Sequence, residues 1–190
     1  MLVKLEPLAQ SDVGDRYLAW MRDPEVTRYL EARFSAPTKE SLVAFVRRSL
    51  QDDTEKLFRI CVEDDYISQY ARDFQGVESG LHVGNLRIHQ ISKQHGTAEV
   101  GLIIGEARFR GCGLGRAALK AAEALCVSDL GIRKLTAGCY ASNHASRRAF
   151  GAAGYREVGT RIDQYCTADG FEDQVLMERL LEPHSSPSGQ

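Results

Sequence analysis

The sequence predicts one α/β (α+β) domain with a mixed β-sheet of about seven strands and helices on its faces. Short apolar segments alternate with amphipathic ones along the chain, and no repeat or linker divides it. A glycine-rich segment follows one strand and opens a helix, as in a β-α-β crossover. The 190 residues suffice for one sizeable core. We expect the domain to span residues 1–182, with a disordered Ser/Pro/Gly-rich tail at 183–190.

The N-terminal residues predict a strand followed by a broken helix. The first six residues favour a strand that Pro7 ends. A helix capped by Ser11 or Asp12 should follow. It should break at Asp23, because an aspartate followed by proline is a second helix-start signal.

Apolar residues spaced three and four apart after Thr38 predict the next helix. Strands are expected at 57–62 and 81–89. The acidic, aromatic segment 63–79 between them has no clear pattern, so its role stays open. The buried face of the helix should consist of Leu42, Phe45, Val46 and Leu50.

One segment says most about function, because it places three glycines in five positions immediately before an alanine-rich helix at 114–130. Glycines let the backbone approach a ligand closely, and a helix start presents unpaired N–H groups and the positive end of the helix dipole. The segment therefore predicts a site for a phosphate-bearing ligand. This glycine loop consists of Arg110, Gly111, Cys112, Gly113, Leu114, Gly115 and Arg116.

Two familiar nucleotide motifs fit the glycine loop less well. A Walker loop requires Gly-Lys-Ser/Thr, whereas Gly115 is followed by arginine and alanine. The dinucleotide fingerprint fits Gly113-x-Gly115-x-x-Ala118, but the next strand, 134–140, offers no carboxylate for a ribose. A dinucleotide-dependent oxidoreductase stays open as a weaker alternative.

The loop and the residues after it resemble the GNAT superfamily of acyl-CoA-dependent N-acetyltransferases. The similarity covers residues 99–158, the cofactor half of that fold. It implies a centrally splayed sheet, acetyl-CoA as co-substrate and no metal. The motifs that carry it are Arg110-x-x-Gly113-x-Gly115, Asn143-x-x-Ser146 and Phe150-x-x-x-Gly154-Tyr155.

The resemblance also implies roles for single residues. The backbone of Ile103 and Ile104 would hold the pantetheine arm in the splay, and the glycine loop would bind the pyrophosphate. Asn143 and Ser146 would contact the cofactor as well as begin a helix. An amine that attacks the thioester directly, in a ternary complex, needs a proton acceptor. Glu99 is our candidate base, because strand alternation lets it face the cleft.

Phe150 departs from the family pattern. Many members carry a tyrosine at this position as proton donor to the leaving thiolate, and a phenylalanine has no proton to give. The general acid is therefore unassigned. The departure also keeps open a non-catalytic CoA-binding regulatory module.

The segment 20–31 resembles the N-terminal helix pair of the branch that includes ribosomal-protein alanine N-acetyltransferases and amino-sugar N-acetyltransferases. This implies a nucleotide-linked amino sugar or a peptide N-terminus as the acceptor. The acceptor site should form near Tyr165 from aromatic and charged side chains, namely Trp20, Tyr29, Glu31 and Arg33.

Composition narrows the partners and the compartment. The formal charge of -2 gives no overall attraction to nucleic acid, and no apolar run approaches the roughly 20 residues that cross a bilayer. We expect neither nucleic acid nor membrane as partner, and a cytoplasmic location. The five cysteines include no Cys-x-x-Cys pair, which argues against a disulfide framework and a zinc site. Whether the chain forms a homodimer stays open.

Overall fold

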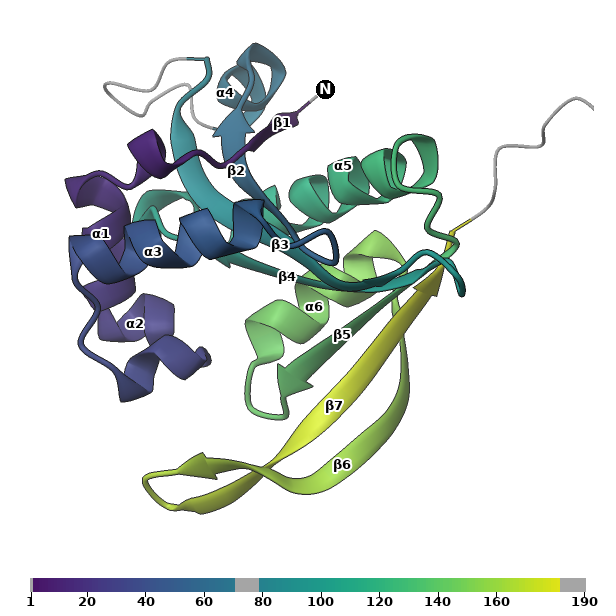
Figure 1. The fold of residues 1–190 in the computed structure, drawn as a ribbon. Helices are drawn as coiled ribbons and strands as arrows, with labels where there is room; N and C mark the ends of the chain where they lie inside the picture. Colours follow the sequence, from purple (N-terminus) through teal and green to yellow (C-terminus); the bar gives the residue numbers. More distant parts are fainter. Residues whose placement is uncertain (1, 71–78, 182–190) are drawn as a thin grey trace, which may run out of the picture.

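The computed structural model describes residues 2–70 and 79–181. One mixed sheet of seven strands is flanked by helices, which confirms the predicted fold class (Figure 1). The strands are β1 Val3–Pro7, β2 Lys56–Val62, β3 His82–Ser92, β4 Thr97–Ile104, β5 Lys134–Tyr140, β6 Arg156–Thr167 and β7 Gly170–Leu180. Their order across the sheet is β1-β2-β3-β4-β5-β7-β6.

The helices lie between the strands along the chain. They are α1 Asp15–Arg22, α2 Pro24–Thr27, α3 Lys39–Leu50, α4 Asp64–Tyr70, α5 Leu114–Ser128 and α6 His144–Ala153. Short 3-10 turns are η1 Gln10–Asp12, η2 Glu31–Phe34 and η3 Ala107–Phe109. In the described part of the chain, no helix is long and apolar enough to cross a membrane.

The sheet is splayed at its centre. Strands β4 and β5 are parallel, and their pairing covers three residues and ends where Glu99 lies opposite Thr136. Beyond that point, residues 100–104 pair only with β3 and residues 137–140 only with β7. The two strands then diverge (Figure 1). We call the opening between 100–104 and 137–140 the wedge.

The two faces of the sheet have separate cores. Leu102 and its alternating neighbours on β4 pack with α5 and α6 in the larger core. In the smaller core, Trp20 of α1 and Val46 of α3 pack with Leu57 of β2. Leu57 pairs across Arg87 with Gly101, so Gly101 and Glu99 face the α1 and α3 side. The wedge is therefore open toward α5 and α6 on one face of the sheet, and toward α1 and α3 on the other face.

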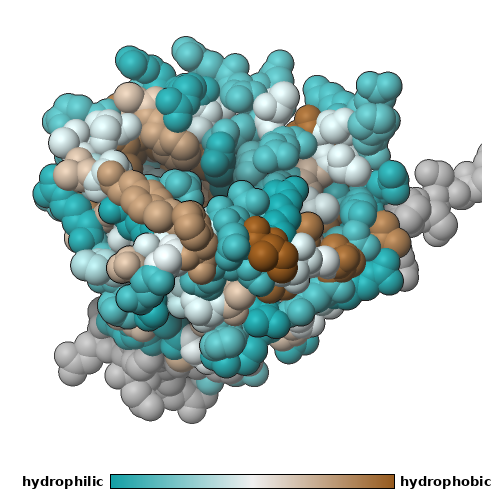
Figure 2. All heavy atoms as spheres, turned by 90° about the horizontal axis from the view of Figure 1, so that it is seen from below, coloured by the Kyte–Doolittle hydropathy of each residue, from teal (hydrophilic) through white to brown (hydrophobic). Residues whose placement is uncertain are grey.

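Strands β6 and β7 form a long hairpin that projects beyond the rest of the sheet (Figure 1). Seen from below, the surface is mostly hydrophilic, with separate hydrophobic areas (Figure 2). The large apolar side chains exposed on the hairpin are Val158, Ile162, Phe171 and Leu180. Between Arg161 and Tyr165 the pairing shifts, and Asp163 has a positive φ of 50°. This bulge bends β6 along its length.

Several local expectations are corrected. Helix α1 begins at Asp15 rather than after Ser11 or Asp12, because Asp12 lies in η1 and its carboxylate accepts from the N–H of Ala9 and binds Arg59. Leu50 is 54% exposed instead of buried. The helix break is confirmed. Asp23 caps α2 by accepting from the N–H of Glu25.

The remaining strand and helix expectations are confirmed within a few residues at the ends. The unassigned segment 63–79 contains α4, and residues 71–78 lie outside the described part, as does the expected tail at 183–190.

Candidate functional site

The glycine loop presents open backbone at the start of α5. Gly111 and Gly113 have positive φ angles of 78° and 77°, which favour glycine. A Cβ on either residue would meet nothing within 4 Å. Gly113 is the N-cap of α5, and no side chain from residues 2–70 or 79–181 caps this helix. The first N–H groups of α5 are therefore free for an anion.

Packing fixes the shape of this loop. The Leu114 side chain is buried in the larger core. A Cβ on Gly115 would lie 3.4 Å from the Cβ of Ala149, so a small residue there lets α5 and α6 pack closely. The Tyr66 hydroxyl of α4 donates to the Cys112 carbonyl at 3.3 Å. Sequence reasoning missed this contact, because the segment that contains α4 had no pattern.

The Arg110 side chain holds the loop to its surroundings. Its guanidinium donates to the carbonyls of Ile104 and Gly105 at 3.2 and 3.0 Å, and lies 3.5 Å from Asp23 at the start of α2. These contacts tie the loop to the end of β4 and leave its guanidinium engaged with protein groups. Arg116, in contrast, is exposed on the first turn of α5 and has no ion pair within the described residues.

Glu99 lies at the foot of the wedge. Its side chain is 32% exposed, and its Oε1 lies 3.9 Å from Nε2 of His89, its partner on β3. Burial and the neighbouring Arg87 lower the pKa of His89, so that ring is neutral at pH 7. A Cβ on Gly101, the next residue on this face, would meet nothing within 4 Å. A partly exposed carboxylate thus lies beside open space over Gly101.

Ile103 and Ile104 lie on the free edge of β4 that faces the wedge. Both side chains are half-buried, and Ile104 packs on the larger core. The Ile104 carbonyl already accepts from Arg110, whereas nothing on β5 pairs with this edge. Strand alternation turns the backbone groups of Ile103 toward β3 and those of Ile104 toward the wedge, which leaves the Ile104 N–H for an extended ligand.

The start of α6 is built by the motif Asn143-x-x-Ser146. The Asn143 side chain accepts from the N–H of Ser146 at 3.1 Å, which is a helix cap. The Ser146 hydroxyl lies 3.3 Å from Sγ of Cys139. Phe150, further along α6, is 3% exposed, and its ring packs edge to face with Tyr155, with centroids 4.9 Å apart. Phe150 is thus a core residue.

The acceptor residues expected from the sequence are only partly brought together. Tyr29 donates to the Ser142 carbonyl at 3.3 Å, and Arg33 donates to the carbonyls of Arg28 and Cys166 at 2.7 and 2.6 Å. Both therefore lie where η2 meets the far end of β5 and the hairpin. Glu31 is exposed at the start of η2.

Trp20 corrects the expectation of a stacking surface. Its side chain is 5% exposed in the smaller core, and its ring lies nearly perpendicular to the His82 ring, with centroids 5.0 Å apart. No face of the indole is left for a nucleobase. Sequence alone did not reveal this, because an aromatic residue on an amphipathic helix suits either role.

A polar network on the hairpin was not foreseen. Tyr165 stacks on Tyr140 with centroids 3.7 Å apart and ring planes at 10°. Gln174 donates to the Tyr165 hydroxyl at 2.5 Å, and Arg161 donates to the Gln174 side-chain oxygen at 3.0 Å. Gly138 makes room for the Gln174 amide, since a Cβ on Gly138 would lie 2.2 Å from Nε2 of Gln174. Arg161 is the partner of Gln174 across the hairpin, and the register shift between Arg161 and Tyr165 sets the place of Tyr165 beside them.

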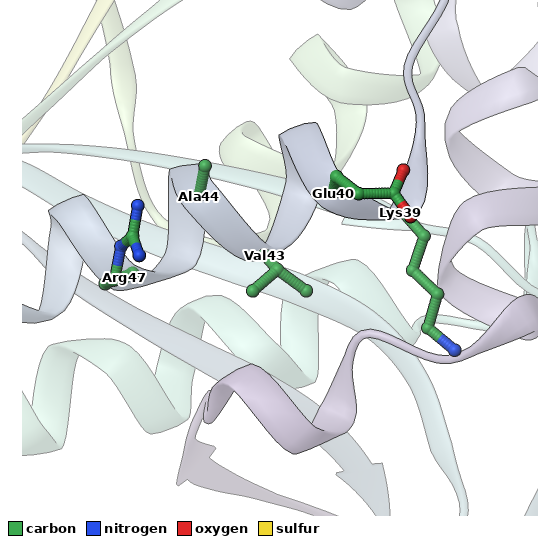
Figure 3. Close-up of a pocket in the computed structure, with 5 residues that line it drawn as sticks. All are labelled: Lys39, Glu40, Val43, Ala44 and Arg47. Carbon is green, nitrogen blue, oxygen red and sulfur yellow. The ribbon is translucent and has the colours of Figure 1, made fainter.

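Two surface hollows lie apart from the wedge. One follows the outer side of α3 and is lined by Lys39, Glu40, Val43, Ala44 and Arg47 (Figure 3). All five residues come from one helix, so no other element brings reactive groups to it. The second is lined by His144, Arg147, Arg148 and Glu157, with Arg147 and Glu157 already paired at 2.8 Å. Neither contains the groups that the glycine loop and Glu99 provide.

Comparison with known proteins agrees with this geometry. The acetyltransferase (GNAT) domain matches residues 3–156. Alpha/beta-tubulin-N-acetyltransferase 9 of Homo sapiens is 25% identical over 191 residues, covering 97% of this chain and 89% of that protein.

Solved structures share the fold. Spermidine N-acetyltransferase from Vibrio cholerae, in complex with CoA and spermine, superimposes with a TM-score of 0.77 at 16% identity, over 95% of this chain and 96% of that one. A GNAT-family acetyltransferase from Bacillus anthracis gives a TM-score of 0.74 at 16% identity, over 95% of each chain. The chain therefore belongs to the GNAT acetyltransferase family and is an acyl-CoA-dependent N-acetyltransferase, rather than the oxidoreductase or non-catalytic module that its sequence left open.

Proposed function

We propose that this enzyme transfers the acetyl group of acetyl-CoA to the α-amine of a peptide or protein N-terminus, by direct attack in a ternary complex. The observation that carries the proposal is the accessible Glu99 carboxylate beside the open space over Gly101, at the foot of the wedge. Acetyl-CoA supplies the thioester carbonyl that the amine attacks.

The glycine loop suits the pyrophosphate of the co-substrate. The N–H groups at the start of α5 and the Arg116 guanidinium, which has no ion pair among the described residues, provide charge-assisted hydrogen bonds. Ile103 and Ile104 at the edge of β4 would border the pantetheine arm, and the Ile104 N–H provides a backbone partner for it. Asn143 and Ser146 begin α6 on the far side of the wedge, where they would border the same ligand.

Glu99 would accept the proton of the acceptor ammonium, directly or through water. With His89 neutral, no adjacent cation within the described residues competes for the carboxylate at pH 7. An α-amine has a pKa near 7.7 to 8.0, whereas a lysine amine has one near 10.4. Glu99 therefore removes the proton of an N-terminal ammonium more easily than that of a lysine or a polyamine.

The residues expected to bind the acceptor favour a peptide with a protonated N-terminus over a nucleotide-linked sugar. A nucleotide needs a stacking surface and a cation for its diphosphate, but Trp20 is buried and Arg33 already donates to two backbone carbonyls. The carboxylates of Glu31 and Glu172 lie near Tyr140 at the same end of β5. The similarity to a tubulin acetyltransferase, whose name indicates a protein acceptor, supports the same choice.

The test is a thiol-release assay with acetyl-CoA and four acceptors: a peptide with a free N-terminus, the same peptide with a blocked N-terminus and one lysine, nucleotide amino sugars, and polyamines. We expect only the free N-terminus to reach kcat/KM of about 10⁴ M⁻¹s⁻¹ or more. Efficient turnover of the blocked peptide, the sugars or the polyamines alone would contradict the proposed acceptor.

A further inference from the structure

Acetyl transfer releases a thiolate that takes up a proton. Phe150 cannot give one, because it has no hydroxyl and its ring is buried against Tyr155. Another element that borders the wedge can supply the donor in its place. Strand β5 forms one wall of the wedge. Side chains of the β6–β7 hairpin lie over part of the face of β5 that is on the same side of the sheet as Glu99.

The Tyr165 hydroxyl is held over that wall. Gln174 places its amide nitrogen against Gly138 of β5, and this nitrogen donates to the Tyr165 oxygen. Since the oxygen accepts from Gln174, the hydroxyl proton of Tyr165 is left to point elsewhere. The phenol ring is half-buried and rests on Tyr140, which fixes its plane.

This position is close to the foot of the wedge. Gly138 lies two residues beyond Thr136, the residue that pairs with Glu99, which is about 7 Å along a strand. Glu99, Thr136 and Gly138 share one face of the sheet. The Tyr165 hydroxyl and the Glu99 carboxylate thus approach the same opening from its two walls.

We propose that Tyr165 is the proton donor to the leaving thiolate, and that Gln174 and Arg161 are positioning residues that aim its hydroxyl. The proposal uses the direct attack described above and does not depend on which amine is the acceptor.

The amine nitrogen bonds to the carbonyl carbon, and the carbon–sulfur bond breaks with its electron pair on sulfur. Sulfur takes the phenol proton and leaves as the CoA thiol. The product nitrogen loses one proton, which returns to the phenolate of Tyr165 through water. Because a phenol is a weaker acid than a thiol, this return is what makes the donation favourable.

The surroundings of Tyr165 keep its proton in place between turnovers. Burial raises the pKa of this phenol above its usual value of about 10, the hydrogen bond from Gln174 opposes the rise, and the Glu99 carboxylate adds to it. The hydroxyl is therefore protonated at neutral pH.

The decisive comparison is Tyr165→Phe against Tyr140→Phe, because the two rings form one stack and each variant removes one hydroxyl. Gln174→Leu is the third variant, because it keeps the Tyr165 hydroxyl but removes the amide that orients it. For each variant we would measure kcat, the KM of the acceptor, the Kd of CoA and the melting temperature, with any amine that the wild type acetylates.

We expect Tyr165→Phe to lower kcat about 100-fold and Gln174→Leu about tenfold, with acceptor KM and CoA Kd within about twofold. Tyr140→Phe should keep the wild-type kcat. Equal losses in the two tyrosine variants, a kcat for Tyr165→Phe near wild type, or a loss confined to acceptor KM would each overturn the proposal. If Tyr165→Phe unfolds, an unchanged kcat in folded Gln174→Leu overturns it. A wild type that acetylates only non-peptide amines refutes the peptide acceptor but leaves this comparison intact.

Discussion

The indole of Trp20 lies directly against the backbone of Gly105. A Cβ placed on Gly105 would be 2.1 Å from Cδ2 of the ring. Gly105 follows β4, and its N–H donates to the Val83 carbonyl at 3.0 Å. Helix α1 is therefore packed onto the point where the sheet ends and the chain turns toward the glycine loop.

Gly105→Ala should lower the free energy of unfolding by about 1–3 kcal/mol, because neither the ring nor the backbone has room to move. Urea unfolding monitored by tryptophan fluorescence would measure it. The matched control is Gly101→Ala, whose Cβ meets nothing within 4 Å and should change stability by less than about 0.5 kcal/mol. Equal stability of the two variants would contradict the close contact.

Glu99→Gln should lower kcat by about 10²- to 10⁴-fold, because an amide accepts no proton at neutral pH. The loss should shrink at high pH, where the acceptor is already a free amine. Steady-state kinetics between pH 7 and pH 10 would show both effects, with CoA affinity as the control for folding of the site. Wild-type turnover at pH 7 would return Glu99 to a structural role.

Gly113→Glu should weaken CoA binding at least about 100-fold, since the carboxylate would stand where the pyrophosphate makes two or three charge-assisted hydrogen bonds. Calorimetry would measure the change. Gly113→Ala shares the strain of a positive φ without the charge, so it should lose much less affinity. If both variants lose the same, backbone strain rather than the anion site explains the effect.

Phe150→Ala should cost about 3–5 kcal/mol of stability, because it removes a buried ring packed on Tyr155. Phe150→Tyr tests the position as a donor. With the proton supplied elsewhere, its kcat should not exceed that of the wild type. Thermal unfolding and kinetics of both variants decide between a packing role and a lost donor, and a raised kcat in the tyrosine variant would favour the latter.

Stability should fall as the pH drops from 7.5 to 5.5. Burial lowers the pKa of His82, which is bonded to Asn85, so the folded state stays neutral while the unfolded imidazole binds a proton below about 6.5. This window lies above the range in which carboxyls such as Glu55, whose pKa is lowered, titrate.

His82→Gln should reduce the slope of stability against pH, measured by urea unfolding at each pH. His89 contributes in the same direction, so part of the slope should remain. The same substitution at the exposed His95 is the control. A slope unchanged by His82→Gln would show that the buried ring is not its source.

Local signals predicted much of the cofactor half. The strand expected at 134–140 is β5 with those bounds, and Gly113 marks the start of α5 because only its backbone conformation suits that cap. Interactions between distant segments were not predictable. Asp12 fails as a helix cap because Arg59, on a strand far along the chain, takes its carboxylate. Trp20 is buried because Gly105 leaves room for its ring.

The acceptor side was the least predictable part. The Tyr165 network depends on the bulge in β6, which shifts the pairing by an amount that alternating polarity does not encode. Arg33 suggested a phosphate ligand by its chemistry, yet its geometry assigns it to two carbonyls. Residue type alone cannot tell a free guanidinium from an engaged one.

The Arg110 contacts have a consequence for the order of events in a catalytic cycle. Because protein groups already hold the loop in shape, a ligand that arrives there has no disordered chain to freeze, and its affinity carries no entropic penalty for folding the loop. The co-substrate can then dock on the empty enzyme before any amine is present. Preorganisation of this kind favours a cycle in which acetyl-CoA enters first.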